Sequence, residues 1–85
     1  MYSKEAIRTF LNNQGQLFDE RVADTPEEAQ EFLEECMAAE LNNIKEVKKY
    51  LFEMGADVSG MSAKELEEQA EVFRLPGGRY LVVEG

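Results

Sequence analysis

The chain of 85 residues contains no histidine, no tryptophan and a single cysteine, Cys36. One cysteine cannot form an internal disulfide, so a reducing compartment such as the cytoplasm is expected. The absence of histidine excludes the usual serine–histidine–aspartate triad and the common zinc sites that use histidine. A catalytic Cys36 would also need an activating neighbour, which histidine most often supplies. The sequence therefore predicts a protein that is not an enzyme and that carries no cofactor.

Long apolar runs and basic clusters are also missing. No window approaches the roughly 20 apolar residues that a membrane-spanning helix needs, and the first ten residues lack the apolar run of a signal peptide. The chain has 9 Lys and Arg against 18 Asp and Glu, which gives a net charge of −9. This excess of negative charge disfavours direct contact with nucleic acid and attracts a basic protein surface. We expect a protein partner and neither a membrane nor a nucleic acid.

The acidic residues gather in the first half of the chain. Residues 19–40 hold nine acidic side chains against Arg21. Such a cluster is more often a solvated helix face, and it can also be a surface that attracts a basic partner. The candidates for partner contact are Glu31, Glu34, Glu35, Glu40 and Asn43.

The longest coherent signal predicts a helix over residues 26–54. Thr25 and Glu28 form a capping box, Pro26 suits the first helical position, and Gly55 suits the residue that follows a helix. An apolar stripe keeps one helical phase from end to end. The stripe consists of Ala29, Phe32, Leu33, Cys36, Met37, Ile44, Val47, Leu51 and Met54.

Glu40 and Asn43 interrupt this apolar stripe, and three interpretations follow. The helix can break near residues 40–43, with Asn43 and Glu46 capping a second helix. The pair can form a polar layer between two helices, or Glu40 can belong to a ligand site. An unbroken helix of this length would run about 44 Å, whereas a compact domain of this size spans roughly 30 Å. The helix therefore either breaks or projects towards a partner, and a homodimer would cover the projecting end.

The remaining elements complete an α+β fold in one small domain. Helices are predicted at about 4–14 and 63–70, the second from the capping box of Ser62 and Glu65. Residues 72–75 and 79–84 predict an antiparallel hairpin, because a proline and two glycines separate two β-prone arms. The second arm is apolar on both faces, so it is expected to be covered on both sides or to pair at its free edge. A third short strand is predicted at residues 17–22.

These features favour a non-catalytic cytoplasmic interaction or regulatory module, with a homodimer as its expected form. Its acidic surface or strand edge would contact a basic partner. An alternative is an accessory domain that binds a small molecule or cation near Glu40, in a pocket lined by Cys36, Asn43 and Phe73 or Tyr80. A third possibility is an acidic mimic of nucleic acid that inhibits a DNA-binding protein.

Overall fold

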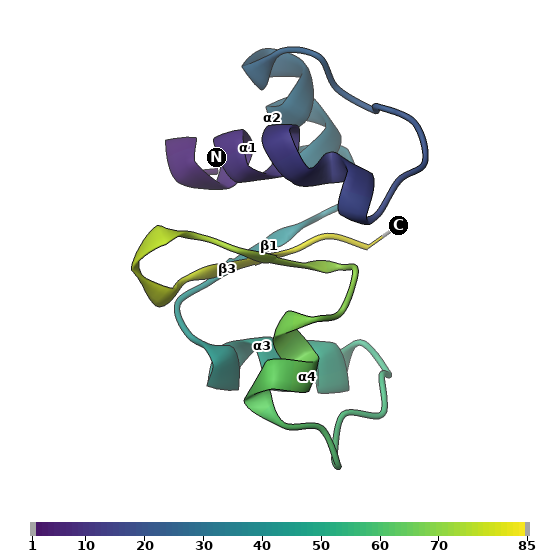
Figure 1. Cartoon of the computed structure of the whole chain (residues 1–85), viewed down its shortest axis with the longest axis vertical. Coiled ribbons are helices and arrows are strands. Elements are labelled where there is room, and N and C mark those ends of the chain that lie inside the picture. Colours follow the sequence, from purple (N-terminus) through teal and green to yellow (C-terminus); the bar gives the residue numbers. More distant parts are fainter. Residues whose placement is uncertain (1, 85) are drawn as a thin grey trace.

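The computed structural model describes residues 2–84 and confirms the α+β class (Figure 1). Four α-helices, two short 3-10 helices and three strands follow one another along these residues. In order they are α1 (Lys4–Asn13), η1 (Gln14–Gln16), α2 (Pro26–Glu35), β1 (Ala39–Leu41), α3 (Ile44–Glu53), α4 (Ala63–Glu67), β2 (Val72–Arg74), η2 (Pro76–Gly78) and β3 (Tyr80–Val82).

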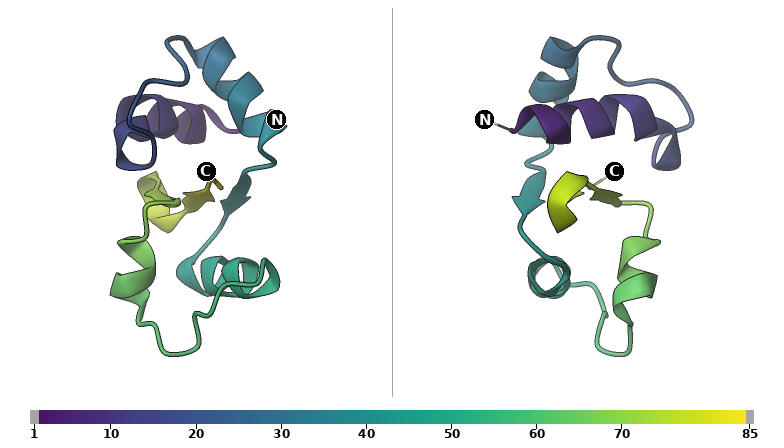
Figure 2. Two further views of the ribbon diagram at one scale, coloured as in Figure 1. Left: turned by 90° about the vertical axis from the view of Figure 1, so that its right-hand side faces the viewer. Right: turned by 60° about the vertical axis from the view of Figure 1, so that its left-hand side comes forward.

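The three strands form an antiparallel sheet in the order β1-β3-β2. Leu81 of the central strand β3 lies opposite Glu40 on one side and Phe73 on the other. Helices α1 and α2 cover one face of the sheet, and α3 and α4 cover the opposite face (Figures 1 and 2). This arrangement explains why β3 is apolar on both faces, since each face of the central strand is covered by a helical layer.

Each face of the sheet has its own hydrophobic cluster. The cluster beneath α1 and α2 contains Ala6, Phe10, Ala23, Ala29, Leu33, Phe73, Leu75, Leu81 and Val83. The cluster beneath α3 and α4 contains Val47, Leu51, Val58, Leu66, Val72, Tyr80 and Val82. In the first cluster the Phe10 ring stacks on Phe32 at 5.7 Å between centroids and meets Phe18 edge-on at 6.3 Å. Such aromatic pairs fix the helices against each other beyond the effect of area burial alone.

The prediction of one continuous helix over residues 26–54 is wrong. The alternative prediction, a helix broken near residues 40–43, is confirmed. Helix α2 ends at Glu35 and α3 begins at Ile44, with strand β1 between them. The end of α2 is a Schellman motif: the Ala38 N–H donates to the Leu33 carbonyl at 3.0 Å, and the Met37 N–H donates to Glu34 at 3.2 Å. Met37 takes the left-handed conformation, with φ of 54°, that this motif usually reserves for glycine.

We predict that Met37→Gly raises the free energy of unfolding by about 0.5–1 kcal/mol, because glycine adopts the left-handed region without steric cost. Met37 is 79% exposed, so its replacement removes little packing. Urea denaturation of the variant measures the gain. Met37→Ala keeps the steric cost and serves as the control, and an equal gain in that variant would contradict this explanation.

The second half of the broken stretch starts at Asn43, as the capping interpretation predicts. The Asn43 side chain accepts a hydrogen bond from the Glu46 N–H at 3.0 Å, and the Glu46 carboxylate accepts from the Asn42 N–H at 2.9 Å. These two bonds satisfy backbone donors at the start of α3. Asn43 is therefore a helix cap.

The third strand lies at residues 39–41, and the prediction of a strand at residues 17–22 is wrong. That segment follows η1 as an irregular link that the buried side chain of Gln14 holds in place. The Gln14 carboxamide oxygen accepts from the N–H groups of Val22 and Ala23 at 2.6 and 3.1 Å. Backbone donors that a sheet ladder would use are thus satisfied by a side chain.

The other predicted elements are present with shorter bounds. Helix α4 ends at Glu67 instead of residue 70, and the hairpin strands span 72–74 and 80–82. Both predicted capping boxes, at Thr25 with Glu28 and at Ser62 with Glu65, are formed. Gly77 and Gly78 in the hairpin turn have φ of 79° and 78°, a conformation that favours glycine.

Candidate functional site

Glu40 forms hydrogen bonds with two parts of the chain that are distant from it in sequence. It lies on the edge strand β1, and its Oε2 accepts a hydrogen bond from Arg79 Nη1 at 2.6 Å. Its Oε1 accepts from the backbone N–H of Ser3 at 3.0 Å. Arg79 also contacts the Glu5 carboxylate at 3.3 Å, so the cluster joins the start of α1, β1 and the hairpin turn. Both carboxylate oxygens of Glu40 are therefore engaged by the protein itself.

The surroundings of Glu40 stabilise its charged form. Burial by itself would raise the pKa of this carboxyl, but the hydrogen bonds from Ser3 and the Arg79 guanidinium outweigh it and lower the pKa. The result is an ionised carboxylate held in an ion pair. This arrangement is typical of a structural tie between segments.

The residues of the predicted Glu40 pocket do not come together. Phe73 belongs to the cluster beneath α1 and α2, whereas Tyr80 belongs to the cluster on the opposite face of the sheet. The Tyr80 hydroxyl donates to the Glu67 carboxylate, and this hydrogen bond, followed by burial, raises the pKa of Tyr80. Cys36 is half-buried against the first cluster, and burial raises the pKa of its thiol. Within residues 2–84, no group of three or more metal-ligating side chains is placed to hold an ion.

The acidic candidates on α2 remain at the surface. Glu31, Glu34 and Glu35 are exposed, as are Glu27 and Glu28 in the first turn. Glu28 is used by the capping box, where it accepts from the N–H groups of Asp24 and Thr25. None of the other four forms an ion pair with a described cation. Helix α2 thus presents uncompensated negative charge to solvent.

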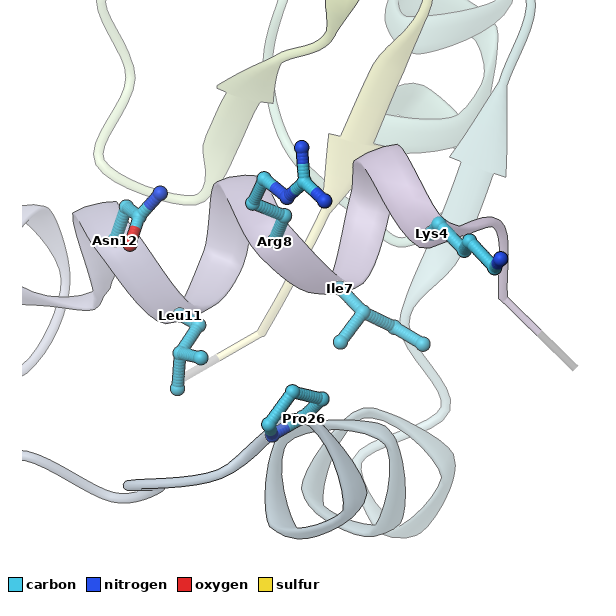
Figure 3. A pocket seen from close by; sticks show the side chains of 6 residues that line it. All are labelled: Lys4, Ile7, Arg8, Leu11, Asn12 and Pro26. Carbon is cyan, nitrogen blue, oxygen red and sulfur yellow. The ribbon is translucent and has the colours of Figure 1, made fainter.

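A hollow of about 420 Å³ lies beside this acidic helix, where α1 meets the start of α2 (Figure 3). Ile7 and Leu11 point from α1 towards Pro26, the first residue of α2, and form an apolar floor (Figure 3). Lys4, Arg8 and Asn12 complete the lining from α1. The two cations therefore border an apolar surface that is open to solvent.

The hollow continues along α2. A second depression of about 370 Å³ shares Ile7 and Pro26 with the first and is lined further by Glu27, Gln30, Glu31 and Glu34. We call the two together the α1–α2 groove. It has an apolar centre at Ile7, Leu11 and Pro26, a basic side with Lys4 and Arg8 on α1, and an acidic side on α2. Among the described residues, this groove combines open apolar surface with charge of both signs, which are the properties of a binding site.

The sequence located only part of this groove. The local excess of negative charge predicted a role for Glu31 and Glu34. It did not predict the apolar and basic lining of the groove, which consists of Lys4, Ile7, Arg8, Leu11 and Pro26. A signal was present, because Ile7 and Leu11 are four residues apart on one helix face and Lys4 and Arg8 repeat the same spacing beside them. The crossing of α1 with the start of α2 brings these residues together.

Comparison with protein-family models, curated proteins and solved structures finds no match for this chain. None of the helices among residues 2–84 has both the length and the apolar character needed to cross a bilayer. The α1–α2 groove and its charges are the features of the described residues that bear most directly on function.

Proposed function

We propose that the protein is a non-catalytic interaction module whose α1–α2 groove receives an amphipathic segment of a partner protein. The observation that carries this proposal is the open apolar centre of the groove, bordered by charge of both signs. An apolar anchor in such a depression removes hydrophobic surface from water, and the flanking charges select the partner. The uncompensated carboxylates of α2 favour a partner segment with a basic flank.

The charges on the two sides of the groove also favour one charge pattern in the bound segment. Basic side chains of the partner belong beside Glu27, Glu31 and Glu34, and acidic ones belong beside Lys4 and Arg8. The reverse orientation would place like charges together, which is unfavourable. The groove therefore favours an amphipathic helix whose basic flank faces α2.

The alternative site at Glu40 has less support. Its carboxylate oxygens are occupied by Arg79 and Ser3, so a bound cation or small molecule would have to displace an internal ion pair. The groove, in contrast, offers its apolar floor without any rearrangement. We therefore place the interaction at the groove.

Selection of a random peptide library displayed on phage tests the proposal. Enriched peptides are expected to combine apolar residues at helical spacing with Lys or Arg along one flank. Ile7→Glu places a charge in the apolar centre and is expected to abolish binding. Glu31→Lys with Glu34→Lys, both exposed on α2, is expected to weaken binding about tenfold, because two favourable charge pairs become repulsive.

The matched control is Asp19→Lys with Glu20→Lys, which makes the same change in net charge at exposed positions outside the groove. Circular dichroism establishes that each variant is folded. Selected peptides that bind the Ile7→Glu variant as tightly as the wild type would disprove a role for the groove. An equal effect of the two charge-reversed variants would show that only net charge matters.

A further inference from the structure

The outer surface of α3 carries a second patch whose charge is opposite to that of α2. The helix carries Lys45 and, three, four and seven residues later, Lys48, Lys49 and Phe52. At these spacings the four side chains share one helical face. With Val58 and Ser59 from the following loop they line a depression of about 500 Å³. Phe52 is 66% exposed, which is unusual for so large an apolar side chain. We call these six residues the α3 patch.

Two internal explanations for the lysines fail. Cations often neutralise the C-terminal end of a helix dipole, but the last turn of α3 contains no basic residue and ends with Glu53. Lysines also commonly pair with nearby acids, yet no described carboxylate lies within ion-pair distance of Lys45, Lys48 or Lys49. Glu46, on the same helix, accepts from the Asn42 N–H at the start of α3. Three lysines without an ion-pair partner among the described residues therefore lie on one face of α3, although the chain has twice as many acidic as basic residues.

We infer that the α3 patch is a second docking surface, and that its occupant is an acidic segment of another protein with an apolar anchor for Phe52. Charge complementarity supports an acidic occupant, and the exposed ring beside the lysine stems supplies apolar contact. The net charge of −9 argues against an anionic membrane or a nucleic acid, whose extended negative surfaces would be repelled by the rest of the molecule.

A second copy of the chain is a poorer occupant, because α2 and α3 lie on opposite sides of the sheet (Figure 1). If the acidic face of α2 docked on α3 of the next copy, the pair would still present one free surface of each kind. Such a head-to-tail contact generates open chains unless it closes into a ring. A separate acidic partner avoids this, and it can bind while the α1–α2 groove is occupied.

Titration with a pair of synthetic peptides tests the inference. The probe is a short helical peptide with glutamates and one leucine along a single stripe, and its twin carries glutamines in place of the glutamates. The probe is expected to bind and to shift the backbone amide resonances of Lys45–Phe52 and Ser59, whereas the twin is expected to bind at least tenfold more weakly. Anionic vesicles and duplex DNA are titrated in parallel.

Substitutions of lysine separate the effect of charge at the α3 patch from the effect of the net charge of the protein. Lys48→Glu is expected to weaken binding of the probe about threefold, and the triple change Lys45→Glu, Lys48→Glu and Lys49→Glu about tenfold or more. Lys64→Glu makes the same change in net charge on α4, outside the patch, and is expected to have a smaller effect than Lys48→Glu. Phe52→Ala is expected to weaken binding severalfold without unfolding the protein, since the ring is mostly exposed.

Several results would overturn the inference. These are equal binding of the two peptides, equal effects of Lys48→Glu and Lys64→Glu, tighter binding to vesicles or DNA, or a concentration-dependent increase in mass that Lys48→Glu abolishes. The Ile7→Glu variant is expected to retain probe binding. Its behaviour distinguishes failure of the α3 patch from failure of the groove.

Discussion

Replacement of Gln14 by methionine is expected to lower the free energy of unfolding by about 3 kcal/mol, because it removes four hydrogen bonds to buried and partly buried backbone groups. Gln14 is 2% exposed, and its carboxamide makes four hydrogen bonds. The oxygen accepts from Val22 and Ala23, and the nitrogen donates to the carbonyls of Leu11 and Ala23 at 3.0 and 2.8 Å. This uses the full capacity of the amide.

Methionine has nearly the shape of glutamine, so the predicted loss isolates the hydrogen bonds from the packing. Chemical denaturation measures the free energy of unfolding. The rate of hydrogen exchange at the Val22 and Ala23 amides is expected to rise by a larger factor than the rate at other amides. Asn13→Met is the matched control, because the Asn13 side chain is exposed and bonds only to Thr9 within its own helix. A loss below about 1 kcal/mol for Gln14→Met would mean that water replaces the amide easily.

Glu40→Gln is expected to lower the free energy of unfolding by about 2 kcal/mol at neutral pH, since it removes a charge-assisted bond to Arg79 that is largely shielded from solvent. The Glu40 side chain is 21% exposed and that of Arg79 is 32% exposed. Glutamine keeps the size of the side chain and can still accept from Ser3 through its single oxygen, so the loss reports on the ion pair with Arg79, through both its charge and its second acceptor. A double-mutant cycle with Arg79→Met should show that the two effects are not additive.

This contribution also depends on pH. The pKa of Glu40 is lower in the folded chain than its ordinary value of 4.5, so folding favours the ionised form. The stabilisation is complete above pH values near 4.5 and is lost as the pH falls through the lower folded pKa. Denaturation of wild type and Glu40→Gln at pH 7 and at pH 3 should show the difference in stability narrowing in acid. A difference that is independent of pH would contradict the ion-pair explanation.

The continuous apolar stripe over residues 26–54 misled the sequence-based prediction for a structural reason. Helices α2 and α3 each have an apolar face, but they pack on opposite faces of the sheet. Strand β1 carries the chain from one layer to the other. Leu33 and Val47, which share one arc of a single predicted helix, therefore belong to different hydrophobic clusters. The phase of the pattern continues although the helix does not.

The groove was only partly predictable for a related reason. The sequence pattern identifies apolar spacing on α1 and negative charge on α2, each from its own neighbours. It contains no information on how α1 crosses the start of α2, and this crossing brings Ile7 and Leu11 to Pro26. Likewise, the role of Glu40 depends on Arg79, 39 residues away in the chain.

The features that could be predicted from the sequence are those held by hydrogen bonds within one turn. The caps at Thr25, Asn43 and Ser62 and the glycine end of α3 at Gly55 are of this kind, because donor and acceptor lie within a few residues of each other. The third strand depends instead on the tertiary structure, because residues 39–41 form a strand by pairing with β3, about 40 residues away in the chain. Pairing between distant segments is selected by the packing of the whole chain, which no local pattern encodes.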